Sequence, residues 1–113
     1  MSPELPTAIP DHLRGRAILP NGNSLEEAVW SPADALVLLD ALAGGSLGVE
    51  GGQVCRREPW GGWVITSESW ACLPIPGEDA LGFAQRSRDE AAAFIETWSE
   101  DHGESVHFAL RFV

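Results

Sequence analysis

The last segment of this chain, VHFALRF at residues 106–112, constrains the fold more than any other stretch. Its apolar residues alternate with His107, Ala109 and Arg111. The apolar residues are Val106, Phe108, Leu110 and Phe112. A period of two is typical of a β-strand that has one buried face. The segment therefore predicts a sheet that is covered on one side by another layer.

Three further strands are predicted in the middle of the chain, which contains valine, isoleucine and tryptophan. They are Gln53–Arg57, Gly62–Thr66 and Trp70–Ile75. The segment Pro59–Gly62 is a turn between the first two. Pro74 and Pro76 end the third strand or place it at the sheet edge, because proline lacks the amide proton that a central strand donates.

Helices are predicted where a serine is followed three residues later by an acid, which is the pattern of a capping box. The serines are Ser24, Ser31 and Ser87. They begin helices over about residues 25–29, 32–43 and 88–100. A short helix over residues 79–86 is also expected, with Leu81, Phe83 and Ala84 turned inward. Gly44 and Gly45 end the helix that follows Ser31.

Two of these helices have an apolar face at helical spacing. The faces are Ala35, Leu38, Leu39 and Leu42 in one, and Ala91, Phe94, Ile95 and Trp98 in the other. Helices, strands, helices and a last strand follow in that order, which predicts an α+β fold with a mainly antiparallel β-sheet packed against helices. The 113 residues fit one domain at 14–113, preceded by a flexible, proline-containing N-terminal arm at 1–13.

The composition indicates a cytoplasmic protein. No apolar run approaches the roughly 18 residues that span a bilayer, and the first residues lack the basic and apolar regions of a signal peptide. Cys55 and Cys72 do not form a CxxC pair, and the histidines show no metal-ligand spacing with them. We expect both thiols to be buried and reduced, and we expect no metal site and no cofactor.

Charge limits the partners of this chain. Seventeen acids against seven bases give a formal net charge of -10. Nucleic acid is not an expected ligand, because its binding needs clustered basic residues, and an anionic membrane surface is disfavoured for the same reason. A basic partner is favoured, since opposite charges speed encounter. Solubility alone is an alternative explanation of the acidity.

No catalytic motif is present in the sequence. A nucleophile elbow, a phosphate-binding loop, a dinucleotide fingerprint and a zinc-protease motif are all absent. The adjacent carboxylates Glu78 and Asp79 are explained by a position at a helix N-terminus, where anions are stabilised. The sequence therefore predicts no catalytic residue, and it favours a binding protein over an enzyme.

The turn at residues 58–62 is the predicted centre of a partner-binding surface. Trp60 lies there between Pro59 and Gly61, where burial is difficult, and exposed tryptophan is a frequent interface anchor. The alternative is that its ring folds back over the edge of the sheet. The predicted partner-binding residues are Glu58, Trp60, Glu68, Glu78 and Asp79. They pair an aromatic anchor with a charged rim.

Four stretches resemble a bacterial immunity protein family of polymorphic toxin systems, the one numbered forty. They are WSPADALVLLDAL at 30–42, GVEGGQV at 48–54, WACLPIPGED at 70–79 and RSRDEAAAFI at 86–95. The resemblance implies an α+β immunity protein that binds and neutralises a cognate toxin. The family pattern has an acid near Gln53 and an aromatic near Cys55, and this chain departs from both. If those positions contact the toxin, the specificity differs here.

Three functions are consistent with the sequence. The first is an immunity protein that acts by direct contact with a toxin, which is expected to be basic. The second is a small enzyme with an unrecognised active site. The third is an acidic mimic of nucleic acid that inhibits DNA-binding proteins. A toxin gene beside this one favours the first, turnover that depends on one carboxylate or histidine favours the second, and inhibition of several unrelated DNA-binding proteins favours the third.

Overall fold

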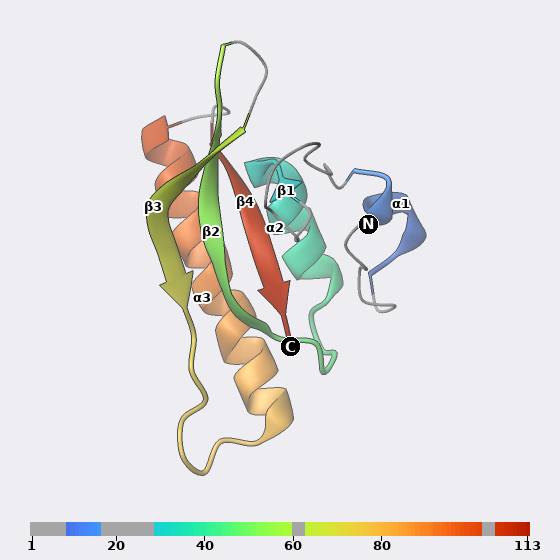
Figure 1. The fold of residues 1–113 in the computed structure, drawn as a ribbon. Coiled ribbons are helices and arrows are strands. Elements are labelled where there is room, and N and C mark those ends of the chain that lie inside the picture. The colour runs from blue at the N-terminus through green and yellow to red at the C-terminus, as the bar shows by residue number, and fades with distance from the viewer. Residues whose placement is uncertain (1–8, 17–28, 60–62, 103–105) are drawn as a thin grey trace.

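The chain folds into a four-stranded antiparallel sheet with helices packed on it (Figure 1). The structure is a computed structural model that describes residues 9–16, 29–59, 63–102 and 106–113. Its elements are α1 (Asp11–Arg14), β1 (Val29–Trp30), α2 (Pro32–Ala41), β2 (Val49–Arg57), β3 (Trp63–Ala71), α3 (Ala80–His102) and β4 (Val106–Phe112). The strand order is β1-β4-β2-β3. The predicted α+β fold is thus confirmed.

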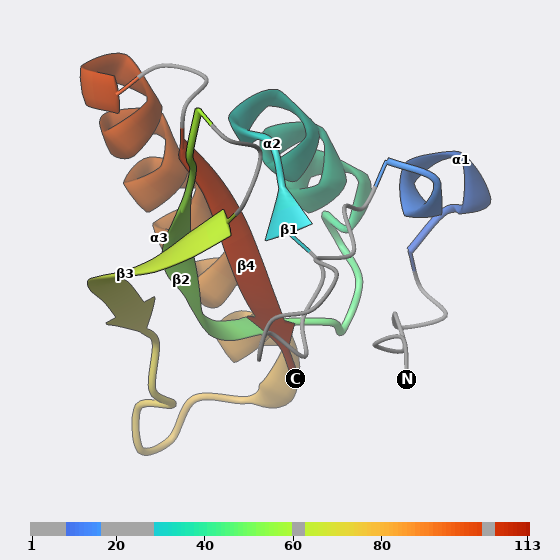
Figure 2. The same ribbon diagram turned by 45° about the horizontal axis from the view of Figure 1, so that its top comes forward.

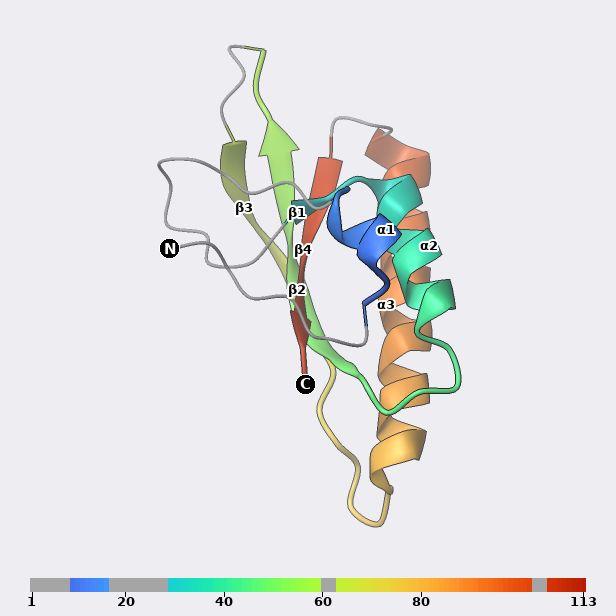
Figure 3. The same ribbon diagram turned by 90° about the vertical axis from the view of Figure 1, so that its right-hand side faces the viewer.

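Helices α2 and α3 cover one face of the sheet (Figure 3). The main core lies between these layers, and Phe108 of β4 is fully buried at its centre together with Val54 and Ile95. Helix α1 lies beside α2 on the side away from α3 (Figure 2). The arrangement places the central strand β4, predicted from its alternation, between β1 and β2.

The second face of β4 differs from the prediction. Val106, Phe108 and Leu110 are buried against the helices as expected. Ala109, assigned to the polar face, is also buried, because it packs with Val29 and Cys55 in a small cluster of its own. A small apolar side chain is compatible with either face, so the alternation alone did not distinguish them.

The prediction of three strands between residues 53 and 75 is wrong, because the second and third form one strand, β3. Gln53 pairs with Ser69 and Cys55 pairs with Ile65, so β3 has two more residues than β2 between these pairs. The hydroxyl of Thr66 donates to the Val54 carbonyl oxygen at 2.9 Å and secures this irregularity. A polar stretch that resembled a break is therefore a bulge within one strand.

Strand β2 begins at Val49 and includes a glycine pair that the prediction left outside any strand. A Cβ atom on Gly52 would collide with the ring of Trp70 and with the Ala109 carbonyl oxygen. A Cβ atom on Gly51 would collide with the Trp70 carbonyl oxygen. The glycines therefore allow Trp70 to lie over β2, where its ring stacks on Phe94 with centroids 4.5 Å apart.

Helix α2 forms as predicted. Ser31 is its N-cap, and the hydroxyl accepts a hydrogen bond from the Asp34 amide at 3.2 Å. The predicted apolar face is buried, and Gly44 follows the helix with a φ of +82° that favours glycine. Capping, apolar spacing and a terminal glycine all agree here, so local signals specified this element.

Helix α3 corrects three predictions. It is one helix of 23 residues, not two short ones, and Ser87 lies inside it. The Ser87 hydroxyl is fully buried and accepts from the Val49 amide at 3.0 Å, while it donates to the Ala84 carbonyl oxygen at 3.0 Å. Asp79 has the capping role instead, since its Oδ1 accepts from the Gly82 amide at 2.6 Å. Leu81, expected inward, is exposed.

The N-terminal region is partly packed. Ile9 and Leu13, the last part of the predicted arm, are buried in the main core. Residues 1–8 lie outside the described residues, and the division into an arm and a domain stays a prediction. Of the helix predicted for residues 25–29, only Val29 is described, and it belongs to β1. In the described segments, no helix has the length and apolarity needed to cross a membrane.

Candidate partner-binding surfaces

The predicted partner-binding residues lie at different ends of the sheet. Glu58 follows β2 at the hairpin end, and Trp60 lies outside the described residues. Glu68 is exposed on β3. Glu78 and Asp79 lie in the loop from β3 to α3, at the opposite end of the molecule from the hairpin (Figure 1). The structure thus brings Glu78 and Asp79 together but not with Glu58.

Two of these acids form ion pairs within the chain. The Glu58 carboxylate accepts from Nε and Nη2 of Arg56, both at 3.1 Å. The Glu78 carboxylate accepts from Arg86, with Nε to Oε2 at 2.7 Å and Nη2 to Oε1 at 2.8 Å. Glu68, by contrast, is exposed and has no ion-pair partner among the described residues. Its charge is therefore available to a partner, whereas that of Glu78 is largely compensated.

Arg86 is the centre of the network that holds the β3–α3 loop. Besides Glu78, its guanidinium contacts the Leu73 carbonyl oxygen at 2.7 Å and Glu90 at 3.3 Å. The hydrogen bonds from Arg86 lower the pKa of Glu78 from 4.5 to about 2. In the same loop the Ile75 amide donates to Glu78 at 3.2 Å, and Gly77 has a φ of +88°. These hydrogen bonds therefore fix the conformation of the loop.

Arg88, two residues further along α3, holds a different loop. Its Nη1 donates to the carbonyl oxygens of Gly45 at 3.0 Å and Leu47 at 2.6 Å, in the connection from α2 to β2. Ser87 lies between the two arginines and binds the first residue of β2, Val49. Consecutive residues 86–88 therefore connect α3 to three segments that are distant in the sequence.

An apolar hollow lies at the β3–α3 end of the sheet. Its volume is about 450 Å³. Its apolar lining is Ala71, Cys72, Leu73, Pro74, Ala80, Phe83 and Val113. Glu50 and Arg111, 3.9 Å apart, lie on its polar side. Glu78 and Asp79 come directly before Ala80 of this lining, so charged groups lie close to an apolar depression, as at many protein interfaces.

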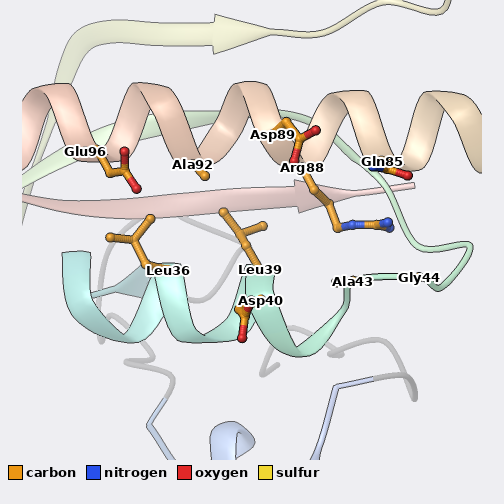
Figure 4. A pocket seen from close by; sticks show the side chains of 10 residues that line it. All are labelled: Leu36, Leu39, Asp40, Ala43, Gly44, Gln85, Arg88, Asp89, Ala92 and Glu96. Carbon is orange, nitrogen blue, oxygen red and sulfur yellow. The ribbon is translucent and has the colours of Figure 1, made fainter.

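A second, more polar groove of about 330 Å³ lies between α2 and α3 (Figure 4). Leu36 and Leu39 point from α2 toward α3, and Arg88 crosses from α3 toward the segment that contains Gly44. The carboxylates along this groove are Asp40, Asp89 and Glu96. Arg88 donates to backbone carbonyls and forms no ion pair with these acids. The groove therefore contributes a negative field on the helical side.

The two cysteines are both buried, and they form no disulfide. The Cys72 amide donates to the Glu50 carbonyl oxygen at 2.9 Å, whereas Cys55 lies five residues further along β2, roughly 15 Å away at strand spacing. Burial raises the pKa of the Cys72 thiol, and the neighbouring Glu90 raises it further. Cys72 is thus a poor nucleophile at neutral pH, and Cys55 is too deeply buried to contact a partner.

Sequence reasoning missed Arg86 and the apolar hollow. A signal for the hollow was present in LPIPGEDAL at 73–81, since its leucines and isoleucine are separated by proline and glycine and fit no amphipathic period. Within the described residues, no three histidine, cysteine, aspartate or glutamate side chains gather in a way that would hold a metal ion.

The comparisons with known proteins identify a family. The model of a protein family described as Immunity protein 40 matches residues 19–112. No curated protein matches the chain, and no solved structure matches it. The matched range covers every strand of the sheet and helices α2 and α3.

Proposed function

This chain belongs to the immunity protein 40 family, and from that membership we propose that it binds and neutralises a cognate toxin by direct protein–protein contact. The match over residues 19–112 is the observation that carries the proposal. The described surface supports it, because it offers an apolar hollow with a charged border. The encounter is proposed to take place in the cytoplasm.

The toxin is proposed to be basic. The chain has a formal net charge of -10, and several exposed acids have no ion-pair partner among the described residues. These acids are Asp40, Glu68, Asp89, Glu96 and Glu100. Such a field accelerates the approach of a positively charged partner. Nucleic acid and membranes are not proposed as partners, since both are anionic.

The site of contact is proposed at the β3–α3 end, which includes Glu78 and Asp79. The hairpin with Glu58 and Trp60, favoured by the sequence, stays a competing proposal. Glu68 lies on the edge strand β3 between the two ends and is compatible with either. A direct comparison uses Trp60→Ala at the hairpin against Leu73→Ser at the loop. The variant that speeds dissociation identifies the end that contacts the toxin.

Co-expression with the toxin encoded beside this gene tests the function. We expect cells that carry both genes to survive, and we expect the purified proteins to form a complex whose association slows as salt rises. Asp89→Asn combined with Glu96→Gln should slow association, with little change in dissociation. Death of the cells that carry both genes, or the absence of a complex between the purified proteins, would refute the immunity proposal. Recovery of a cleaved or chemically modified toxin would favour the small-enzyme alternative.

A further inference from the structure

We infer that the apolar hollow at the β3–α3 end receives an apolar side chain from the toxin, and that Leu73, Ile75 and Leu81 surround this anchor. The inference rests on the proposed function, because it specifies how the toxin is bound. It departs from the hairpin-centred surface that the sequence favoured. Three observations support it: the distribution of exposed apolar side chains, the hydrogen bonds that hold the loop and the charge of the border.

Exposed apolar side chains gather at this end of the molecule. Among the described residues, five large apolar side chains are exposed, and four of them are here. The exposed fractions are 74% for Leu73, 53% for Ile75, 58% for Leu81 and 60% for Val113, whereas Val37 on α2 stands apart at 48%. Scattered apolar exposure is ordinary, but a contiguous group beside a depression marks an interaction site.

The loop that presents these side chains is held in place. The Leu73 carbonyl oxygen accepts from Arg86 at 2.7 Å, and the Glu78 amide donates to the Ile75 carbonyl oxygen at 2.9 Å. The Arg86 guanidinium also lies 5.7 Å from the centre of the Phe83 ring, which lines the hollow. Leu73 and Ile75 are therefore exposed by an ordered turn. Such order lowers the entropy that binding would otherwise cost.

The net negative charge around the hollow favours a basic partner. Four carboxylates face two guanidiniums there, a formal charge of -2. The acids are Glu50, Glu78, Asp79 and Glu90, and the bases are Arg86 and Arg111. A second copy of this chain would bring like-charged borders together across a two-fold interface, which is unfavourable. A partner with an apolar side chain flanked by lysine or arginine fits both the depression and its border.

The test compares Leu73→Ser and Leu81→Ser with the matched control Val37→Ser. All three residues are exposed, so each variant should melt within about a degree of the unmodified chain. We expect Leu73→Ser and Leu81→Ser each to weaken binding of the neighbouring toxin at least about tenfold, mainly through faster dissociation. Val37→Ser should bind as the unmodified chain does.

The other possible outcomes refute the anchor site, the proposed function or the choice of the toxin as the partner. If the unmodified chain binds and all three variants bind equally well, the hollow is not the anchor site, and the proposed function stands. If the unmodified chain forms no complex, the proposed function fails and the anchor with it. Sedimentation of the chain alone addresses self-association: a dimer that Leu73→Ser dissociates would assign the hollow to a second copy and overturn the inference.

Discussion

Two loops of this molecule are held by neighbouring arginines through different chemistry. The loop between β3 and α3 is bound by Arg86, whose main partner is the carboxylate of Glu78 at 2.7 Å. The connection between α2 and β2 is bound by Arg88, whose partners are backbone carbonyls of Gly45 and Leu47. The first loop borders the apolar hollow, and the second borders the acidic groove.

Because of this difference, the two loops should respond differently to changes in salt and pH. An ion pair near the surface weakens with salt and with protonation of its acid. A charged donor buried against carbonyl oxygens responds to neither, because arginine and the peptide carbonyl do not titrate in the accessible range. The α2–β2 connection should therefore keep its conformation when pH or salt changes. The β3–α3 loop, and the anchor site beside it, should become more mobile in acid or high salt.

The largest expected effect is that of Arg88→Met. Methionine keeps most of the apolar stem but removes both hydrogen bonds to partly buried carbonyl oxygens. We expect unfolding free energy to fall by about 2–3 kcal/mol, since hydrogen bonds from charged donors contribute more than neutral ones. Urea unfolding measures this, and Arg56→Met, at an exposed ion pair, is the control with an effect within about 0.5 kcal/mol. A loss as small as that of the control would contradict the difference between the loops.

Ser87→Ala should have an intermediate effect. The substitution leaves the buried Val49 amide without its acceptor at 3.0 Å, which costs about 1–2 kcal/mol. Ser99→Ala is the matched control on the same helix, because that hydroxyl only donates to the exposed turn before it, and it should be near neutral. Thermal unfolding of both variants gives the comparison. Equal melting temperatures would mean that Ser87 does not connect α3 to β2.

Glu78→Gln should have the smallest effect, and only above acidic pH. The folded-state pKa of Glu78 is lowered from 4.5 to about 2, so the pair stabilises the fold fully above about pH 4.5 and loses this contribution as pH falls toward 2. The difference in urea midpoint between the unmodified chain and Glu78→Gln should therefore be present at pH 7 and shrink between pH 4.5 and pH 2. Glu100→Gln, on an exposed acid that has no ion-pair partner among the described residues, is the control at pH 7 and should be near neutral there. A difference that is constant with pH would contradict the assignment of Glu78 to the Arg86 pair.

Amide hydrogen exchange measures the local stability of each loop separately. Arg86→Met should raise amide exchange at residues 73–78 and leave residues 45–48 protected, whereas Arg88→Met should do the reverse. Each amide reports local opening, so the two patterns separate the loops without reference to total stability. Faster exchange in the same loop for both variants would show that the two regions are a single unit.

Local signals in the sequence determined several elements of this protein. Ser31, the spacing of Ala35, Leu38 and Leu39, and the terminal Gly44 specify α2, because a helix cap and an apolar stripe depend only on residues a few positions apart. The alternation of residues 106–112 specified β4 for the same reason. The family likeness was also carried by short stretches of sequence, and the match over residues 19–112 confirmed it.

Tertiary structure alone decided the rest, because the deciding partners are distant in the chain. Ser87 carries a capping pattern, yet the amide that uses its hydroxyl belongs to Val49, 38 positions away. The polar stretch inside β3 resembles a break between strands in the sequence. In the fold, the Thr66 hydroxyl donates to the Val54 carbonyl oxygen, and the strand continues. Leu73, which lines the hollow, is exposed, and its carbonyl oxygen accepts a hydrogen bond from Arg86, 13 positions away. A local sequence pattern limits the contacts that a residue is able to make. Which of these contacts forms depends on the residues that the fold brings next to it.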